Sequence, residues 1–517
     1  MSTKENFAEE ISSSYSFKGD YITLGGAIYG GECINNLLIK IPLKTLNRHG
    51  LIAGATGTGK TKTLQIITEQ LSSKSIPVLV MDVKGDLSGI AKPGTVNPKI
   101  EERHQKIGLQ YTAEGFPVEM LSLSDEKGVR LRATVSEFGP VLLSKILELN
   151  DTQASFVSLI FKYCDDSHLP VLDLKDFKRV LQYVSAEGKA DIEKEYGKIS
   201  TTSVGIILRK VIELEQQGAE KFFGEKSFEV DDLVRIDDKG RGIISIIRLV
   251  DLQDKPKLFS TFMLSLLAEI YSSFPEEGDL AQPKLTIFID EAHLIFKEAS
   301  KALLEQIETI IKLIRSKGVG VFFCTQNPTD IPASVLSQLG LKVQHALRAF
   351  TAKDRQMIKL TAENYPISEY YKTDEMLTSL GIGEAAITAL NEKGIPTPLA
   401  ATLLRAPQSR MDILSDDEIN EIVGNSKLVP KYNETIDRES AYEMLNRKIE
   451  VSQVPKMESL PKYEEPKRPV GRPKVEKSTF EKVLTSPTTK QIGRTLAREF
   501  TRGILGVLGL GGTTRRR

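Results

Sequence analysis

Residues 49–61, which read HGLIAGATGTGKT, restrict the possible folds of this chain more than any other segment. A short apolar run leads into a turn with three glycines, and the turn ends in Lys60 and Thr61. Glycines let a backbone curl until its N–H groups point into one cavity, which suits phosphate oxygens. The positive N-terminal end of a following helix favours the same ligand. The pattern G-x-x-x-x-G-K-[ST] therefore predicts a strand, a phosphate-binding loop and a helix start in direct succession.

This motif predicts that the chain binds ATP together with magnesium. Lys60 would reach the β- and γ-phosphates, and the Thr61 hydroxyl would ligate Mg²⁺. The residues expected to contact the nucleotide are Gly54, Ala55, Thr56, Gly57, Thr58, Gly59, Lys60, Thr61 and Thr63.

A second motif, LTIFIDEAH at 285–293, places two acids at the end of an apolar strand. Ligands of open α/β sheets lie at the carboxyl ends of the strands. Asp290 is therefore the predicted Mg²⁺ ligand, acting through water. Glu291 is the predicted base, which orients and polarises the attacking water. His293 either joins this network or makes a structural hydrogen bond, and the sequence leaves both readings open.

Two further predicted strands end in polar residues that suit the same site. Gln326, in VFFCTQNP, would contact the γ-phosphate or the attacking water and act as a sensor. The segment MDVKGDL carries Asp82, Lys84 and Asp86 at a strand end. These charges either bridge to the acid pair or to water, or they are solvated in a plain turn.

Two arginines are candidates for a finger that neutralises charge on a neighbouring subunit's nucleotide. Arg315, in KLIRSKGVG, is the first candidate and Arg348, in HALRAF, is the second. For Arg315 the alternative is a helix C-terminal cation that the helix dipole favours.

The wider pattern predicts an α/β fold. Short apolar strands alternate with helices, which indicates a mostly parallel sheet covered on both faces. Strands are expected within 78–87, 242–250, 285–293, 319–327 and 341–347, and helices at 142–164, 256–272, 299–317 and 352–361. The chain is predicted to begin with a short N-terminal β segment at 1–48, in which residues 1–20 are a loose polar stretch. The ATPase core is predicted in two parts, at 49–96 and at 241–450, with a large helical insert at 97–240 between them and a closing hairpin in the second part. Residues 451–517 are predicted to form a flexible basic tail, which consists of a disordered linker and an amphipathic helix.

The charge of the chain is divided unevenly between the body and the tail. The whole sequence has 69 basic and 69 acidic residues, for a formal net charge of zero. Residues 451–517 hold 15 Lys/Arg and six Asp/Glu, so the first 450 residues hold 54 basic and 63 acidic residues. Within 489–517, cations and apolar residues each recur every four residues on opposite helix faces. This pattern predicts a basic amphipathic helix for a membrane surface, nucleic acid or partner subunit.

The same composition indicates a cytoplasmic protein. Cys33, Cys164 and Cys324 lie far apart, which argues against a disulfide framework or a clustered cysteine metal site. No run approaches the ~18 apolar residues that span a bilayer. The N-terminus has acidic residues and lacks the apolar stretch of a signal peptide.

The chain resembles the HerA/FtsK superfamily of P-loop ATPases, and within it the bacterial HerA-like helicase-domain proteins. The resemblance rests on NRHGLIAGATGTGKT, DVKGDLSG, RATVSEFGP, DEAHLIF, IRSKGVGVFFCTQNPTDIP and DRESAYEML, and it covers about residues 20–450 and the C-terminal helix. One position departs from the pattern, because Asn327 stands where the superfamily usually has arginine. A DEAH-box RNA helicase would need a late QRxGRxGR-like motif, and a GTPase an NKxD-type motif, and the sequence has neither.

The resemblance implies a RecA-like core that assembles as a homo-oligomer, a hexameric ring, with each nucleotide between subunits and an arginine reaching it in trans. By position, Lys60, Thr61, Asp290, Glu291 and Gln326 match the superfamily's functional residues. The implied activity is ATP hydrolysis that translocates or unwinds DNA. The sequence leaves open an ATP-dependent assembly platform, a mover of proteins or envelope components docked through its basic tail, and a small-molecule kinase.

Overall fold

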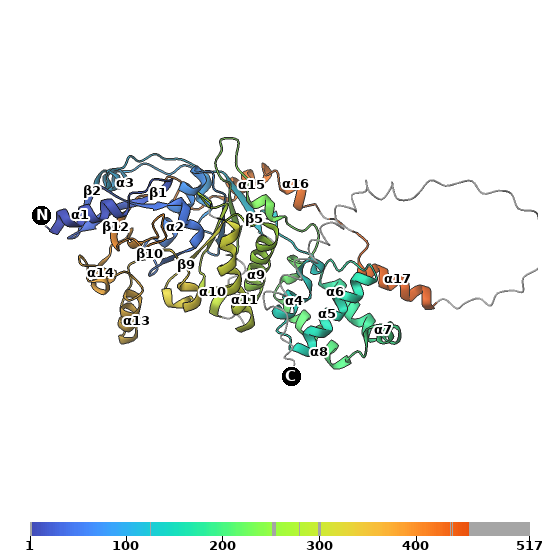
Figure 1. The fold of residues 1–517 in the computed structure, drawn as a ribbon. Helices are drawn as coiled ribbons and strands as arrows, with labels where there is room; N and C mark the ends of the chain where they lie inside the picture. The colour runs from blue at the N-terminus through green and yellow to red at the C-terminus, as the bar shows by residue number, and fades with distance from the viewer. Residues whose placement is uncertain are drawn as a thin grey trace, which may run out of the picture. The chain divides into compact units, whose positions relative to one another are not determined.

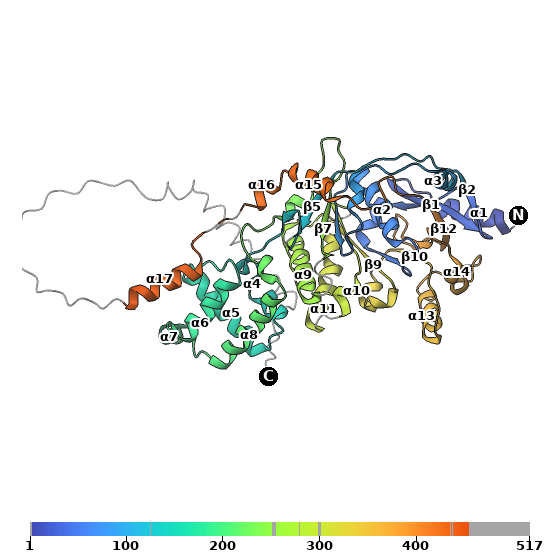
Figure 2. The ribbon, with the colours of Figure 1, turned by 180° about the vertical axis from the view of Figure 1, so that it is seen from behind.

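The computed structural model describes residues 3–124, 126–250, 255–278, 280–297, 301–434, 436 and 438–453. Residues 1–442 form one compact unit, and a second unit begins at Glu443. Figure 1 traces the chain through its helices and strands, and Figure 2 gives the view from behind.

Within the described residues, twelve strands form one sheet in the order β2-β1-β12-β11-β10-β3-β9-β8-β4-β7-β5-β6. They are β1 (Tyr21–Tyr29), β2 (Glu32–Pro42), β3 (Gly50–Ala53), β4 (Val78–Asp82), β5 (Val118–Ser122), β6 (Val129–Arg130), β7 (Ile244–Arg248), β8 (Leu285–Ile289), β9 (Val319–Thr325), β10 (Leu341–His345), β11 (Glu384–Thr388) and β12 (Ala400–Leu404). Neighbouring strands are parallel from β10 to β6 and antiparallel from β2 to β10. The predicted α/β fold with a mostly parallel sheet is confirmed.

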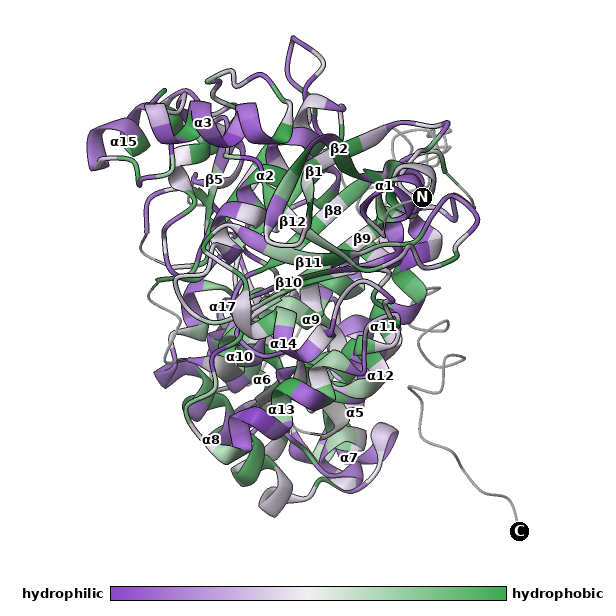
Figure 3. Ribbon diagram, turned by 90° about the vertical axis from the view of Figure 1, so that its left-hand side faces the viewer, coloured by the Kyte–Doolittle hydropathy of each residue, from purple (hydrophilic) through white to green (hydrophobic). Residues whose placement is uncertain are grey.

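Helices cover both faces of this sheet. In chain order, the described helices are α1 (Thr3–Ser14), α2 (Lys60–Ser73), α3 (Pro98–Ile107), α4 (Val135–Ile146), α5 (Asp151–Asp166), α6 (Leu174–Ser185), α7 (Lys189–Tyr196), α8 (Thr201–Gln216), α9 (Pro256–Ser273), α10 (His293–Lys297), α11 (Lys301–Ile314), α12 (Ala333–Leu336), α13 (Ala352–Ala362), α14 (Thr373–Ser379), α15 (Asp416–Gly424), α16 (Val429–Tyr432) and α17 (Ala441–Gln453). Figure 3 shows α2 and α3 on one face and α9, α10 and α11 on the opposite face. Every residue of β3, β8 and β9 is buried, as central strands covered on both faces require.

The stretch 97–240, expected to be a helical insert, also supplies two strands of the sheet. β5 and β6 lie at its edge, beyond β7. The helices outside the sheet begin at α4 and end with α8. The single helix predicted over 142–164 is two helices, α4 and α5. Asn150 starts α5, because its side chain accepts the Gln153 N–H while Gln153 accepts the Asn150 N–H, a capping box.

The prediction of a loose polar stretch at 1–20 is wrong, because α1 packs against β1 and β2. Phe7, Ile11 and Tyr15 are buried and recur every four residues, so they lie on one helix face. The Tyr15 hydroxyl donates to the carbonyls of Ile387 (3.1 Å) and Pro398 (2.7 Å). These bonds attach the N-terminus to the antiparallel side of the sheet.

We expect Phe7→Ala to lower the free energy of unfolding by about 3 kcal/mol, because the phenyl ring is fully buried. Phe350→Ala is the matched control, since the Phe350 side chain is 87% exposed and its loss should change stability by less than ~0.5 kcal/mol. Urea denaturation of both variants tests this. Equal stability of the two would show that α1 does not contribute to the core.

Two strands near the C-terminal end of the first unit form the predicted closing hairpin. β11 and β12 pair antiparallel, with Glu384 opposite Leu403 and Ile387 opposite Ala400. The predicted flexible tail at 451–517, with its linker and amphipathic helix, lies outside the described residues after Gln453. Among the described helices, none combines the length and the apolar character that crossing a bilayer requires.

Candidate nucleotide site

The phosphate-binding motif lies at the carboxyl end of β3, between the ends of β9 and β10. β3 pairs in parallel with both neighbours. The Gly54 N–H donates to the Thr325 carbonyl (3.3 Å), and the Ala55 N–H donates to the Ala346 carbonyl (2.9 Å). The loop is therefore attached to both adjacent strands, and α2 starts directly behind it.

Three glycines give the loop its shape. Gly54, Gly57 and Gly59 have φ angles of 149°, 77° and 116°, where residues with a side chain are strained. A Cβ on Gly54 would also lie 2.5 Å from the Cβ of His345. Gly54 is therefore required both for the turn and for the close approach of β10.

Lys60 lies inside the curl of this loop. Its side chain is mostly buried, and its Nζ donates to the carbonyls of Gly54 (2.7 Å) and Ala55 (3.1 Å). Burial lowers the pKa of Lys60 and Lys84 lowers it further, while Glu291 and Asp290 oppose the shift. The loop lysine and the acid pair are thus close enough to influence one another.

Other predicted loop residues support the loop from within. The Thr58 hydroxyl donates to the Ala55 carbonyl (2.7 Å), and the Thr58 carbonyl accepts the Gly383 N–H (3.0 Å). Thr61 is partly buried in the first turn of α2. Thr63 is fully buried, and its hydroxyl hydrogen-bonds to His345 Nε2 (2.8 Å). The contact of Thr63 with nucleotide stays a prediction.

The acid pair follows β8, which lies two strands from β3 across β9. The side chains of Asp290 and Glu291 are almost completely buried. Within the described residues, Asp290 Oδ2 has no hydrogen-bond partner. Burial raises the pKa of Asp290 to about 7; Lys84 opposes this shift and the neighbouring Glu291 adds to it. A buried carboxylate oxygen of this kind suits a divalent cation.

Glu291 has an unusual backbone conformation, and its carboxylate contacts two side chains. Its φ of 47° lies in the left-handed region, which is uncommon for a residue with a side chain. Oε1 forms an ion pair with Lys84 Nζ, and Oε2 lies 3.1 Å from His293 Nδ1. The sequence allowed His293 either a site role or a structural hydrogen bond, and Lys84 either a bridge to the acid pair or solvation in a turn; both side chains contact this carboxylate.

The turn after β4 is organised by Asp82. Its carboxylate accepts hydrogen bonds from the backbone N–H groups of Gly85 (2.7 Å), Asp86 (3.2 Å) and Leu87 (3.1 Å). Burial raises the pKa of Asp82 to about 6, and the backbone hydrogen bonds oppose this shift. Asp82 therefore shapes the turn, whereas Lys84 extends from it to the acid pair.

Gln326 and Arg315 lie at opposite ends of β9. Gln326 follows the strand directly and is exposed at the edge that carries the phosphate loop. Asn327 begins a short 3-10 helix as its N-cap, in a capping box with Asp330. Arg315 precedes the strand, and a seven-residue strand spans about 20 Å. Arg315 is therefore remote from its own loop, and its role on a neighbour's nucleotide stays a prediction.

Arg348 lies on the phosphate-loop edge. It follows β10, it is exposed, and its Nη1 donates to the Thr378 carbonyl (3.3 Å). Arg348 therefore lies at the protein surface, beside the predicted nucleotide site.

His345 was not predicted from the sequence. It ends β10, contacts Gly54 and Thr63 as described, and is buried. Burial lowers the pKa of His345 to about 4 and Lys60 contributes, so the imidazole is neutral at pH 7. Its place at the end of an apolar strand was the available sequence clue.

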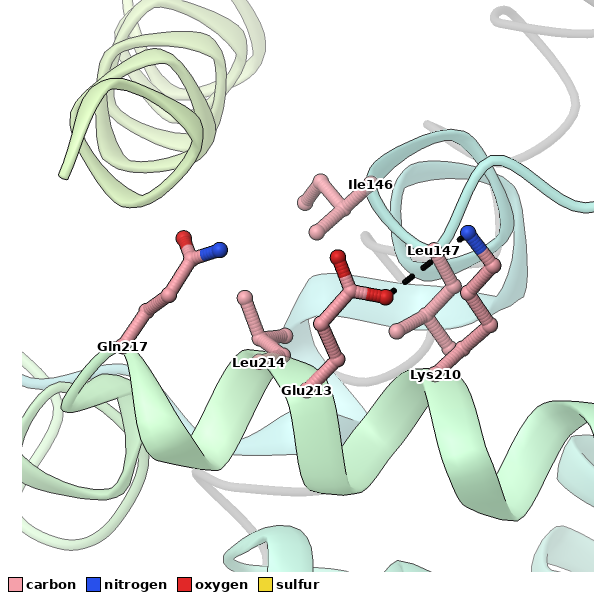
Figure 4. A pocket seen from close by; sticks show the side chains of 6 residues that line it. All are labelled: Ile146, Leu147, Lys210, Glu213, Leu214 and Gln217. Atoms are coloured by element: carbon pink, nitrogen blue, oxygen red, sulfur yellow. Dashed lines mark ion pairs between the residues drawn. The ribbon is translucent and has the colours of Figure 1, made fainter.

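Figure 4 shows a small pocket between α4 and α8, away from the predicted nucleotide residues. It is lined by Ile146, Leu147, Lys210, Glu213, Leu214 and Gln217. Lys210 and Glu213 form an ion pair across 3.8 Å. The pocket contains none of the residues predicted to bind nucleotide.

Comparisons with known proteins agree with this geometry. A family model described as Helicase HerA-like C-terminal matches residues 32–516. The "DNA double-strand break repair helicase HerA" of Sulfolobus acidocaldarius is 23% identical over 398 residues, which cover 75% of this chain and 70% of that protein. The protein of the same name from Saccharolobus solfataricus is 24% identical over 388 residues, covering 73% and 68%.

The fold is shared with a solved structure of the bacterial conjugative coupling protein TrwBdeltaN70 in complex with sulphate. The TM-score is 0.51 at 15% sequence identity, covering 79% of this chain and 94% of that one. The family match spans most of the chain and includes both the phosphate loop and the acid pair. The chain therefore belongs to the family of helicase HerA-like C-terminal domains, and it is an ATP-hydrolysing P-loop ATPase.

Proposed function

We propose that the chain is a subunit of a hexameric ring that uses ATP hydrolysis to translocate or unwind DNA. Membership of the HerA-like family supports this, as do two relatives that are named DNA repair helicases. The observation that carries the proposal is the common edge of β3, β9 and β8. These adjacent strands end in the phosphate loop, in Gln326 and in the acid pair.

In the proposed mechanism, the loop N–H groups and Lys60 bind the phosphates of ATP. Lys60 Nζ has three donors, and two of them hold it against the loop carbonyls of Gly54 and Ala55. This fixes the ammonium group at the mouth of the loop. A fixed cation stabilises charge on the transferred phosphoryl group without reorganising during the reaction.

Thr61 and Asp290 would hold Mg²⁺. When bound, the ion would supply positive charge that offsets the negative charge developing on the phosphate oxygens. The buried Asp290 oxygen without a hydrogen-bond partner fits this role. Within the described residues no group of three acidic, histidine or cysteine side chains forms a metal site, and Mg²⁺ in such enzymes relies on one or two protein ligands plus phosphates.

Glu291 orients the attacking water and receives its proton. Gln326, exposed at the end of the intervening strand, contacts the γ-phosphate or this water. Arg315 acts on the nucleotide of a neighbouring subunit, which its distance from its own loop supports. Hydrolysis at one interface then moves adjacent subunits, and the ring advances along DNA.

DNA-stimulated ATPase activity tests this function. We expect duplex DNA to raise turnover by the purified full-length chain at least several-fold, with a native mass of about six subunits. The Glu291→Gln variant, assayed with and without DNA, measures the ATP hydrolysis that does not depend on the proposed base. If duplex DNA, single strands and RNA all leave turnover unchanged, the DNA motor is rejected. In that case we favour the alternative function, which is an assembly platform or a mover of proteins or envelope components that docks through residues 489–517. Truncation at about residue 450 tests that docking.

A further inference from the structure

The Glu291 carboxylate is held from two sides by the protein. Lys84 Nζ pairs with one oxygen, and His293 Nδ1 lies 3.1 Å from the other. Apart from these two contacts, neither oxygen accepts a hydrogen bond within the described part of the chain. Each carboxylate oxygen has two lone pairs, so the Glu291 carboxylate can still accept a hydrogen bond from a water molecule.

The turn that carries Lys84 is built to hold it in this place. Three backbone N–H groups that follow Lys84 donate to the Asp82 carboxylate. Gly85 has a φ of 76°, which the tight turn needs. β4 and β8 are parallel neighbours, with Met81 paired to Ile289. The register therefore brings the residues after β4 beside the residues after β8, and this allows Lys84 to form its ion pair with Glu291.

The surrounding charges explain why a cation is needed there. Asp82, Asp290 and Glu291 are three buried carboxyl groups at adjacent strand ends. Three neighbouring carboxyl groups concentrate negative charge in a region where water screens it poorly. Lys60 is committed to the loop carbonyls and, in the proposed mechanism, to the phosphates. The cation paired directly with Glu291 is Lys84.

We propose that Lys84 is a positioning residue that holds the Glu291 carboxylate oriented toward the attacking water. The inference rests on the proposed role of Glu291 as the base. It goes further by assigning the lysine of the VKGDL turn to the hydrolytic step instead of to nucleotide binding. His293 holds the second oxygen of the same carboxylate.

An ordinary surface ion pair would have little effect, because exposed pairs contribute about 0–1 kcal/mol. The Lys84–Glu291 pair differs from such pairs because the Glu291 side chain is only 7% exposed. The Lys84 side chain is 39% exposed. Removing a cation from a buried carboxylate leaves an uncompensated charge. The chain offers a matched comparison in Lys74, which pairs with Asp20 at 2.9 Å and has a 41% exposed side chain.

The test compares steady-state ATP hydrolysis without DNA, and binding of a fluorescent ATP analogue, in five full-length variants, one of which is Glu291→Gln alone. Lys84→Ala should lower kcat by about 10- to 100-fold, as loss of a positioning group does, with little change in KM or in analogue affinity. Lys84→Arg, which keeps the charge, should recover most of the rate. Lys74→Ala should match the wild type. In a Glu291→Gln background, Lys84→Ala should cause no further loss.

Several results would overturn the proposal. Wild-type or raised kcat in Lys84→Ala would show that the pair does not assist hydrolysis. A loss confined to analogue affinity would make Lys84 a binding residue, and an arginine variant as impaired as the alanine variant would remove the role of charge. If Glu291→Gln itself hydrolyses ATP normally, the proposed base fails. If Glu291→Gln is inactive and Lys84→Ala is normal, only the Lys84 assignment fails.

Discussion

Glu291→Gln is expected to lower ATP turnover by about 10²- to 10⁴-fold, the usual contribution of a general base. Glutamine has nearly the shape of glutamate but cannot accept the proton of the attacking water. The hydrogen bonds of Lys60 to the loop carbonyls do not involve Glu291, so ATP should still bind and remain trapped. Phosphate release measures turnover, and retention of labelled nucleotide after gel filtration measures trapping.

The control for Glu291→Gln is Glu277→Gln. Glu277 pairs with Lys284 at 2.9 Å before β8, at the end of the strand remote from the acid pair. Its substitution should leave turnover unchanged. Normal hydrolysis by Glu291→Gln would refute the assignment of the base, whereas loss of ATP binding would show that Glu291 holds the nucleotide.

Lys60→Ala should remove hydrolysis by a different route, because it weakens ATP binding itself. A hydrogen bond to a charged group contributes about 1.5–3 kcal/mol, so the loss corresponds to roughly 10- to 100-fold in affinity. The loop also loses the ammonium that spans the carbonyls of Gly54 and Ala55. Fluorescent ATP binding and phosphate release should therefore both fall in this variant.

Lys74→Ala is the matched control for Lys60→Ala, since Lys74 lies at the far end of the same helix. It should bind and hydrolyse ATP like the wild type. Unchanged affinity in Lys60→Ala would contradict the role of the loop lysine in binding. Trapped ATP in this variant would show that Lys60 acts only in the chemical step.

The parallel part of the fold could be predicted because its strands are short continuous apolar runs between helices. β8, β9 and β10 all lie within the predicted segments. α1 was missed because a short helix with many polar residues has little intrinsic stability, and its packing depends on distant partners such as Ile387 and Pro398. β5 was missed because VEMLS is brief and lies beside helical sequence.

The site could be predicted where one continuous motif supplies it, and less well where distant segments meet. The phosphate loop lies where G-x-x-x-x-G-K-[ST] predicts, between strand and helix. The contact of Lys84 with Glu291 joins residues more than 200 positions apart, and that of Thr63 with His345 joins residues 282 apart. Sequence spacing does not report such pairs, because the order of strands in the sheet brings them together.

The most direct test of the central claim is release of a third DNA strand from a duplex that carries it as a triplex. A motor moving along the duplex removes this strand without separating the other two. The wild-type chain should release it with ATP and Mg²⁺, and should not do so with ADP; Glu291→Gln should not release it with either nucleotide. Hydrolysis of ATP without strand release from any duplex, single-stranded or RNA-containing substrate would contradict translocation on nucleic acid.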